Sequence, residues 1–358
     1  MNSDQASASS ALERLQAKAG QSFPNITEAR RLTDATLGRL RGILRDKDPT
    51  DTSIVVFGSL ARGEYTAGSD VDWTLLIDGQ ADPTHYDSVR AINDALKQAG
   101  FHEPGPSGVF GNVAWSHPLL HTIGGPDDTN KLTTQRILLL LEAAAVCKDE
   151  ALERVVTRVL TRYVEEDRGL LYARKRAIVP RFLLNDIVRY WRMLAVDFVH
   201  KQRNYAGGWA LRNTKLRLSR KLIYVSGLLM CFSPELDGGE ARWSAEGGGV
   251  DVAVLVAFLH ASTRVCPLDH LALAALRPSI TEATARALFE AYDTFLGVLA
   301  DQEKRDHLKN LTFDDLDRGD ALFRETSGIG RRFQEALNKL FFEEDPELRR
   351  LLQDYGVF

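Results

Sequence analysis

Cysteine is scarce in this chain of 358 residues, which has only three. The three are odd in number, far apart and outside any Cys-x-x-Cys pair: Cys147, Cys231 and Cys266. This argues against a disulfide framework or a cysteine-based zinc site and fits a reducing cytoplasm. Long hydrophobic runs are also missing, since residues 222–232 and 250–259 are too short to cross a bilayer. The polar start, residues 1–10, lacks the apolar stretch of a signal peptide. We therefore expect a cytoplasmic protein with no membrane partner.

The sequence also lacks a marked excess of either charge. Lys and Arg number 45 and Asp and Glu 49, for a net charge of −4. With 26% charged and 44% hydrophobic residues, the composition is that of a globular protein and excludes disorder or a fibrous repeat. At roughly 150 residues per domain, the length predicts about two domains.

Hydrophobic periodicity and turn residues predict an α+β fold. They indicate helices over 25–47 and 83–100 and strands over 53–57, 71–77, 108–115 and 119–125. From residue 133 onward the pattern is almost wholly helical, with a glycine-rich loop at 233–249. We expect a flexible start over residues 1–24, then a small mixed β-sheet flanked by helices over 25–165. An all-helical domain should follow over 166–358.

The stretch that carries chemistry is residues 57–77, FGSLARGEYTAGSDVDWTLLI. Asp70 and Asp72 are two apart on a predicted strand, so both carboxylates should point to the same face. Two such carboxylates suit Mg²⁺, which prefers oxygen ligands and shares itself with substrate phosphates. Upstream, Gly58 permits a close backbone approach and Ser59 offers donors to a phosphate. Arg62, one helical turn beyond Ser59, could reach the same anion.

Together these residues, Gly58-Ser59-x-x-Arg62-Gly63-x₅-Ser69-Asp70-x-Asp72, resemble the signature of the DNA polymerase β-type nucleotidyltransferase superfamily. That superfamily includes kanamycin nucleotidyltransferases, uridylyl- and adenylyltransferases of nitrogen regulation, CCA-adding enzymes and cyclic-oligonucleotide synthases of bacterial defence. The resemblance implies transfer of a nucleoside monophosphate from a nucleoside triphosphate to a hydroxyl, with pyrophosphate leaving.

The resemblance also implies roles for individual residues. Asp70 and Asp72 would hold two Mg²⁺ (or Mn²⁺) ions. Gly58, Ser59 and Ser69 would hold the triphosphate, while Arg62 would either help them or only brace the loop.

One expected residue of the superfamily is missing from its usual place. A third carboxylate normally sits on a later strand, yet residues 112–125 contain no Asp or Glu. His117 and His121 fall there instead, and we interpret them as structural rather than as metal ligands. Asp128 is the candidate for the third carboxylate. Its absence from the site would leave nucleotide binding intact but put catalysis in doubt.

The near-neutral total charge hides a basic segment. Residues 174–221 hold thirteen Lys or Arg and only two acids, a net +11 that leaves −15 for the rest of the chain. Aromatic residues are interleaved, as binding to polyphosphate or single-stranded nucleic acid requires. The alternative is a solvated helix face whose arginines pair with the acidic remainder. Related enzymes supply a Lys and a Ser from the helical domain to the β- and γ-phosphates, and Lys215 and Ser219 match them in type and spacing.

The leading hypothesis is a metal-dependent nucleotidyltransferase with its site in a cleft between two domains. The favoured acceptor is a nucleotide or nucleic-acid 3′-hydroxyl, with an oligonucleotide or cyclic product that acts on a separate effector protein, as in anti-phage defence. A protein hydroxyl, as in AMPylation, UMPylation or toxin-type modification, is the second class. A catalytically degenerate nucleic-acid-binding protein is the third. A cationic drug is disfavoured, because a +11 segment would repel it.

Overall fold

The computed structural model describes residues 10–102, 104, 109–171, 177–204, 207–238, 240–245, 249–312, 315 and 318–357. By internal contacts the chain divides into two compact units. The first, here called the sheet unit, comprises Glu28–Lys201 and Met230–Cys266. The second, the helical unit, comprises Met1–Thr27, Gln202–Leu229 and Pro267–Phe358. Each unit is therefore assembled from segments that are distant in the sequence.

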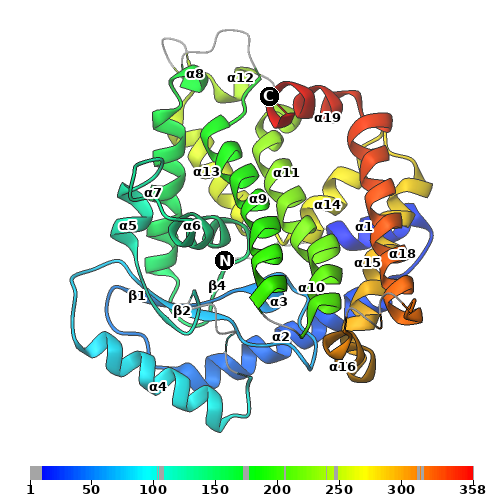
Figure 1. Cartoon of the computed structure of the whole chain (residues 1–358). Coiled ribbons are helices and arrows are strands. Elements are labelled where there is room, and N and C mark those ends of the chain that lie inside the picture. The colour runs from blue at the N-terminus through cyan, green and yellow to red at the C-terminus, as the bar shows by residue number, and fades with distance from the viewer. Residues whose placement is uncertain are drawn as a thin grey trace, which may run out of the picture. The chain divides into compact units, whose positions relative to one another are not determined.

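The sheet unit is built on a four-stranded mixed sheet in the order β3-β2-β1-β4. Figure 1 labels β1, β2 and β4 of this sheet. The strands are β1 (Thr52–Val56), β2 (Trp73–Ile77), β3 (Asn112–Trp115) and β4 (Ala144–Ala145). β1 pairs antiparallel with both β2 and β4, whereas β2 and β3 are parallel, with Thr74 opposite Asn112. A small mixed sheet with helices around it confirms the predicted α+β class.

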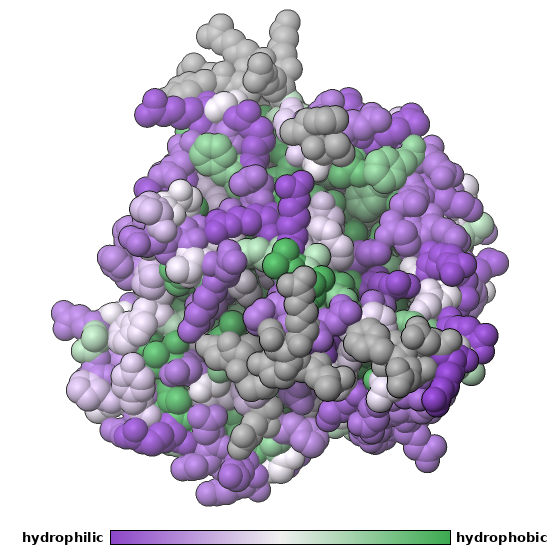
Figure 2. Space-filling view, in the orientation of Figure 1, coloured by the Kyte–Doolittle hydropathy of each residue, from purple (hydrophilic) through white to green (hydrophobic). Residues whose placement is uncertain are grey.

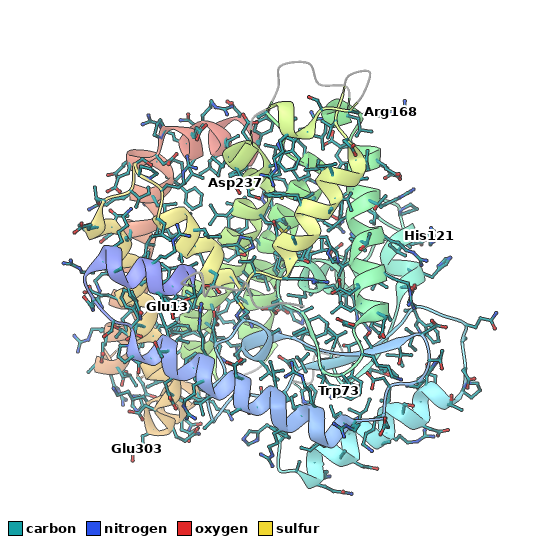
Figure 3. The ribbon with its side chains drawn as sticks, turned by 180° about the vertical axis from the view of Figure 1, so that it is seen from behind. Glu13, Trp73, His121, Arg168, Asp237 and Glu303 are labelled. Carbon is teal, nitrogen blue, oxygen red and sulfur yellow. The ribbon has the colours of Figure 1, made fainter. Side chains whose placement is uncertain are left out.

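Helices cover both faces of this sheet. On one face, Trp73, Leu75 and Ile77 of β2 pack into a hydrophobic core with residues of α2 (Pro24–Leu44) and α4 (Thr84–Gln98). Trp73 is fully buried and lies at the sheet above these helices (Figure 3). The other face carries α6 (Asn130–Leu141), whose Ile137–Leu141 stretch is buried as predicted.

The remaining helices follow the predicted helical pattern. In the sheet unit they are α3 (Gly58–Ala61), α5 (Ser116–His121), α7 (Glu150–Glu166), α8 (Arg168–Leu171), α9 (Arg181–Asn204), α12 (Glu240–Trp243) and α13 (Val252–Thr263), with α9 ending in the helical unit.

The helical unit contains α1 (Ala11–Ala19), α10 (Trp209–Lys215), the π-helix η1 (Leu216–Arg220), α14 (Pro267–Ala275), α15 (Glu282–Ala300), α16 (Gln302–Asn310), α18 (Ala321–Asn338), η2 (Lys339–Glu344), α19 (Pro346–Leu351) and η3 (Leu352–Val357). α11 (Lys221–Gly238) begins in this unit and ends in the sheet unit.

Three expectations differ from the structure. The predicted strand 119–125 is wrong, because Ser116–His121 forms α5, where Leu119 and Leu120 are both buried as neighbours on a helix can be. The predicted loop 233–249 begins too early, because α11 runs on to Gly238. The backbone carbonyl of Pro234 in this last turn accepts a hydrogen bond from Trp243 Nε1 at 2.9 Å. The start is also more ordered than expected, because a capping box of Ser10 and Glu13 begins α1.

Figure 2 shows a face that is largely hydrophilic, with hydrophobic residues gathered in smaller groups. Within the described ranges, no single helix is long and apolar enough to cross a membrane; only α13 and α14 taken together, interrupted at residues 264–266, reach that composition.

Candidate active site at the first two strands

Gly58 brings the backbone that follows β1 against the second aspartate. Its φ is +68°, in the left-handed region that favours glycine. A Cβ at this position would lie 3.2 Å from Asp72 Oδ2, and the Phe57 N–H donates to the Asp72 carbonyl oxygen at 2.9 Å. Both the backbone conformation and the available space therefore call for glycine where α3 begins.

The two aspartates precede β2 rather than lying on it, since the strand begins at Trp73. The expected alternation between buried and solvent-accessible side chains nevertheless holds. Val71 and Trp73 are buried, whereas Asp70 is exposed and Asp72 is half-buried. Both carboxylates thus lie on the side of the chain opposite the α2–α4 core.

Arg62 is engaged in buried ion pairs. Its Nε lies 2.9 Å from Glu64 Oε2, and its Nη1 contacts Glu142 at the end of α6. All three side chains are buried. Of the two roles expected for Arg62, the geometry supports bracing the loop.

The loop between α3 and β2 is held at two further points. The Tyr65 N–H donates to Thr33 Oγ1 of α2 at 3.1 Å. Ser69 Oγ lies 3.0 Å from Thr66 Oγ1 and accepts from the Thr66 N–H at 3.3 Å. Ser69 is buried and closes this turn, whereas Ser59 is half-buried beside Gly58. Ser59 is therefore the better placed of the two serines to meet a ligand.

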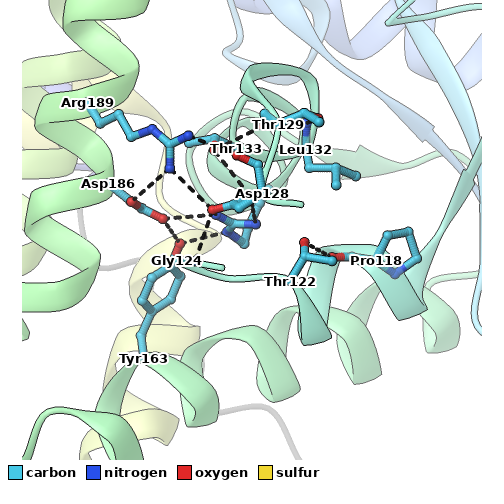
Figure 4. A network of polar contacts seen from close by, with 11 residues as sticks. Pro118, Thr122, Gly124, Asp128, Thr129, Leu132, Thr133, Tyr163, Asp186 and Arg189 are labelled. Atoms are coloured by element: carbon cyan, nitrogen blue, oxygen red, sulfur yellow. Dashed lines mark hydrogen bonds and ion pairs between the residues drawn. The ribbon is translucent and has the colours of Figure 1, made fainter. Parts of the chain in front are cut away.

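Asp128 does not join Asp70 and Asp72 as the third carboxylate. It lies in a largely buried polar network of six side chains from the segment before α6 and from α6, α7 and α9 (Figure 4). Arg136 donates to both of its oxygens, at 3.2 and 2.9 Å, and Arg189 Nη1 lies 3.2 Å from Oδ2. Among the described residues, no three His, Cys, Asp or Glu side chains are arranged to hold a metal ion. The expectation for Asp128 is corrected accordingly, because its carboxylate is already occupied by arginines.

The same network shifts the pKa of its members. Burial by itself would raise the pKa of Asp128, but hydrogen bonds from Arg136 and Gly124 and the charges of Arg136 and Arg189 hold it below its usual value. Tyr163 Oη donates to Asp186 Oδ2 at 2.6 Å and accepts from Arg136 Nε at 2.7 Å. Burial, together with the Asp186 charge, raises the Tyr163 pKa well above its usual value. The network thus favours an ionised Asp128 and a neutral Tyr163 phenol.

Asn112 is the residue that the sequence analysis missed. The parallel register sets it opposite Thr74 at the start of β3, at the end of the sheet where Asp72 precedes β2. Because side chains alternate along a strand, Asn112, Thr74 and Asp72 share a face. Asn112 is exposed. Its side chain is neutral, so a pattern of carboxylates does not include it, whereas the register of β2 and β3 places it here. His117 and His121 lie against each other on α5, with ring centroids 4.5 Å apart and the ring planes tilted by 43°, and both are exposed.

The basic segment divides into two parts. In the sheet unit, Arg181 pairs with Asp167, Arg189 with Asp128, and Lys201 with Asp197. The two arginine pairs, with carboxylates outside the segment, are of the kind that the alternative expected, whereas Lys201 pairs with an acid of the segment itself. Tyr190 is buried and cannot stack on a base. Three further cations of the basic segment, Arg174, Lys175 and Arg176, lie outside the described residues.

Lys215 and Ser219 lie in the helical unit, at the junction of α10 and η1. Ser219 Oγ donates to the Lys215 carbonyl oxygen at 3.2 Å, and Ser219 is buried. Their predicted role toward a bound triphosphate stays a prediction.

Comparison with known proteins bears on the segment just described. Residues 37–103 match the family model described as Nucleotidyltransferase domain. No curated protein matches the chain. The matched segment contains β1, α3 and β2, and with them Gly58, Ser59, Asp70 and Asp72. Residues 37–103 therefore form a nucleotidyltransferase domain, as the resemblance of the Gly58–Asp72 motif predicted.

Proposed function

We propose that this protein transfers a nucleoside monophosphate from a ribo- or deoxyribonucleoside triphosphate to a hydroxyl in an Mg²⁺- or Mn²⁺-dependent reaction. The observation that carries the proposal is the close approach of Gly58 to the Asp72 carboxylate, since a Cβ at Gly58 would lie 3.2 Å from Asp72 Oδ2. Asp70 precedes it by two residues and is exposed. Two carboxylates that can act as metal ligands therefore lie next to α3, the short helix that follows β1.

The donor set of Asp70 and Asp72 fits Mg²⁺. This ion is commonly bound through one or two carboxylates plus the phosphates of a substrate, without an all-protein cage. Asp70 and Asp72 would hold it, and the chemistry supplied is neutralisation of charge at the reacting and leaving phosphates.

The protein residues supply positioning. Gly58 lets the chain approach closely, and Ser59 offers a hydroxyl to the triphosphate. The acceptor oxygen forms a bond to the α-phosphorus while the bond from that phosphorus to the β-phosphate oxygen breaks, and pyrophosphate leaves. The hydroxyl proton passes to water, because Asp70 is exposed and no third carboxylate joins the pair among the described residues.

The favoured acceptor is a nucleotide or nucleic-acid 3′-hydroxyl. Support comes from the cations of α10 and η1, which include Arg212 and Arg220. An oligonucleotide product would act on a separate effector protein, as in anti-phage defence. The three cysteines are free, which suits the reducing cytoplasm where we place this activity.

A second candidate is a catalytically degenerate protein that binds nucleic acid without transferring a nucleotide. The specific observation behind it is Asn112, a neutral side chain at the strand position beside the aspartate pair. Catalysis with only two carboxylates would then be lost while nucleotide binding survives.

Incubation with each α-labelled nucleotide and Mg²⁺ or Mn²⁺ tests the proposal. We expect label to move to a short nucleic acid, and Asp70→Asn and Asp72→Asn to abolish transfer while keeping the fold. Asp94→Asn on the exposed face of α4 is the matched control and should transfer normally. Label on protein would favour the protein-hydroxyl class. Absence of transfer together with tight nucleic-acid binding would favour the degenerate candidate.

A further inference from the structure

Three buried charged side chains tie the loop after α3 to the end of α6. Arg62 Nε donates to Glu64 Oε2 at 2.9 Å, and Arg62 Nη1 donates to Glu142 Oε2. The side chains of Arg62, Glu64 and Glu142 are only 10%, 2% and 6% exposed. Because Nε and Nη1 point in different directions from one planar guanidinium, the two carboxylates fix both its position and its orientation.

Glu142 reaches this arginine because β4 lies beside the end of β1. The two strands are antiparallel, with Ala144 opposite Val56. Continued by two residues, past Val56 and before Ala144, this register brings Glu142 alongside Gly58. A strand of only two residues thus places a buried carboxylate next to the candidate site.

The backbone of the same loop holds Gly58 and Ser59. The Arg62 N–H donates to the Gly58 carbonyl oxygen at 3.1 Å, and the Glu64 N–H donates to the Ser59 carbonyl oxygen at 2.8 Å. The residues whose side chains are ion-paired are therefore the ones whose N–H groups fix the first two residues of α3. A shift of Arg62 or Glu64 is passed to Gly58 or Ser59 through one backbone hydrogen bond.

Stability alone is a weak explanation for these ion pairs. Removing charges from water is costly, and well-packed apolar side chains of similar volume often stabilise a protein as well as a buried ion pair does. A buried ion pair can instead specify one geometry of the groups around it. The sheet unit offers a comparison in Asp78, whose side chain is 4% exposed and contacts Arg154 Nε at 2.8 Å and Arg158 Nη1 at 3.2 Å. Asp78 follows β2, at the end of the strand opposite to Asp72.

We propose that Glu142 is a positioning residue of the nucleotidyl transfer, which holds the backbone of Gly58 and Ser59 through Arg62 and Glu64. The inference rests on the proposed function, since it assigns Glu142 to the binding of the nucleotide of that reaction. Glu142 acts on the nucleotide only through the loop. Its loss should therefore weaken binding of the triphosphate more than it slows the chemical step.

Glu142→Gln tests this with little change in side-chain size. In the labelled-nucleotide assay we expect the KM for the nucleotide to rise roughly tenfold and kcat to fall less than about threefold. Without nucleotide, hydrogen exchange of residues 57–65 should be faster than in the wild type, because the Arg62 and Glu64 N–H groups are held less firmly. Residues 84–98 of α4 should exchange as in the wild type.

Asp78→Asn is the matched control, because it removes a carboxylate charge from buried ion pairs of the same unit. It should lower the unfolding temperature, as Glu142→Gln does, and leave the KM unchanged. A triple variant, Arg62→Met, Glu64→Met and Glu142→Met, removes all three charges together. It should unfold near the wild-type temperature and still show the raised KM, which separates geometry from stability.

Three results would overturn the inference. The first is a wild-type KM in Glu142→Gln or in the folded triple variant. The second is an equal rise of the KM in Asp78→Asn, because the effect would then follow from lower stability. The third is unchanged hydrogen exchange of residues 57–65 in Glu142→Gln, because the loop would then be held without Glu142.

Binding of α,β-methylene nucleoside triphosphates with Mn²⁺, measured by calorimetry, separates this inference from the proposed function. These nucleotides cannot transfer their nucleoside monophosphate, so their binding does not depend on catalysis. If the wild type binds them tenfold more tightly than Glu142→Gln but transfers no label, the proposed reaction alone is rejected. If the wild type transfers label and Glu142→Gln binds them equally well, the inference alone is rejected.

Discussion

Gly58 is the residue whose replacement most directly tests the geometry of the site. In Gly58→Ala, the new Cβ would meet Asp72 Oδ2 at 3.2 Å and the left-handed backbone would be strained. We expect the free energy of unfolding to fall by about 1–2 kcal/mol and nucleotide transfer to fall at least tenfold, because the carboxylate must shift. Urea denaturation and the labelled-nucleotide assay measure the two effects.

Gly42 provides the matched control for this change. It lies inside α2, it is exposed, and a Cβ there would have no neighbour within 4 Å. Gly42→Ala should therefore raise stability by roughly 0.5–1 kcal/mol through lower chain entropy and leave transfer intact. Equal behaviour of the two variants would show that Gly58 has no special role.

Asn112→Asp tests whether β3 lies beside the aspartate pair in the way the register indicates. The change adds a carboxylate on the face shared with Asp72. We expect affinity for Mn²⁺ in the absence of nucleotide to rise about tenfold, because a third negative charge joins two others at close range. Titration followed by electron paramagnetic resonance measures it. Asn93→Asp on α4 is the control, and an equal gain there would refute the placement.

Sequence patterns could predict the Asp70–Asp72 pair because its spacing and neighbours are local. They could not predict the fate of Asp128. Its partner Arg189 is 61 residues away, and the ion pair depends on how α9 packs near α6. Arg62 shows the same limit, since Glu142 lies 80 residues further on. Local patterns report backbone geometry, whereas long-range ion pairs arise only from the tertiary fold.

At the scale of elements, sequence prediction succeeded where hydrophobic residues recur at the regular spacing of a helix or a strand. β1, β2, α2 and α4 lie within a few residues of their expected bounds. It failed at residues 119–125, where a short apolar stretch fits a strand or a buried helix equally. It also failed at 233–238, where tertiary contacts extend α11 past Pro234, with Glu235 accepting a hydrogen bond from the Ile178 N–H at 2.9 Å.

The buried network joins α6, α7 and α9, and Tyr163 gives it a pH dependence. In the unfolded chain the phenol of Tyr163 begins to ionise near pH ~10. In the folded protein its pKa is raised, so the phenol stays neutral to a higher pH. Its stabilising contribution is therefore complete below pH ~10 and declines as the pH rises further. Tyr163→Phe should lower the free energy of unfolding by about 1–3 kcal/mol near pH 8, because Arg136 and Asp186 lose a partner.

The readout is how this difference changes with pH. Urea denaturation is measured near pH 8 and again above pH ~10. The difference in free energy of unfolding between the wild type and Tyr163→Phe should become smaller at the higher pH, because the phenol ionises in the unfolded chain. Tyr86→Phe, at a half-exposed position on α4, controls for the loss of a tyrosine and should show no such trend. A gap that stays constant would mean that the folded state does not hold Tyr163 neutral.

At the scale of the whole molecule, the overall charge is less informative than its distribution between the two units. The basic segment crosses from the sheet unit to the helical unit. Its first part is neutralised by carboxylates such as Asp167 and Asp128. Arg212 and Arg220 in the second part have no such partner among the described residues. A net charge of −4 thus conceals a basic segment that is partly paired with carboxylates in the sheet unit and continues into the helical unit.

Assembly of the helical unit from distant segments gives the N-terminus a structural role that the sequence did not suggest. α1 packs against α14 and α15, and Lys18 Nζ donates to the Ala275 carbonyl oxygen at 2.9 Å. Leu15 is fully buried there. Leu15→Ala should therefore lower the free energy of unfolding by about 2–5 kcal/mol in urea denaturation. Exposed Arg14→Ala should change it by less than about 0.5 kcal/mol. If the two variants were equally stable, α1 would not be part of the unit's core and the start would be flexible after all.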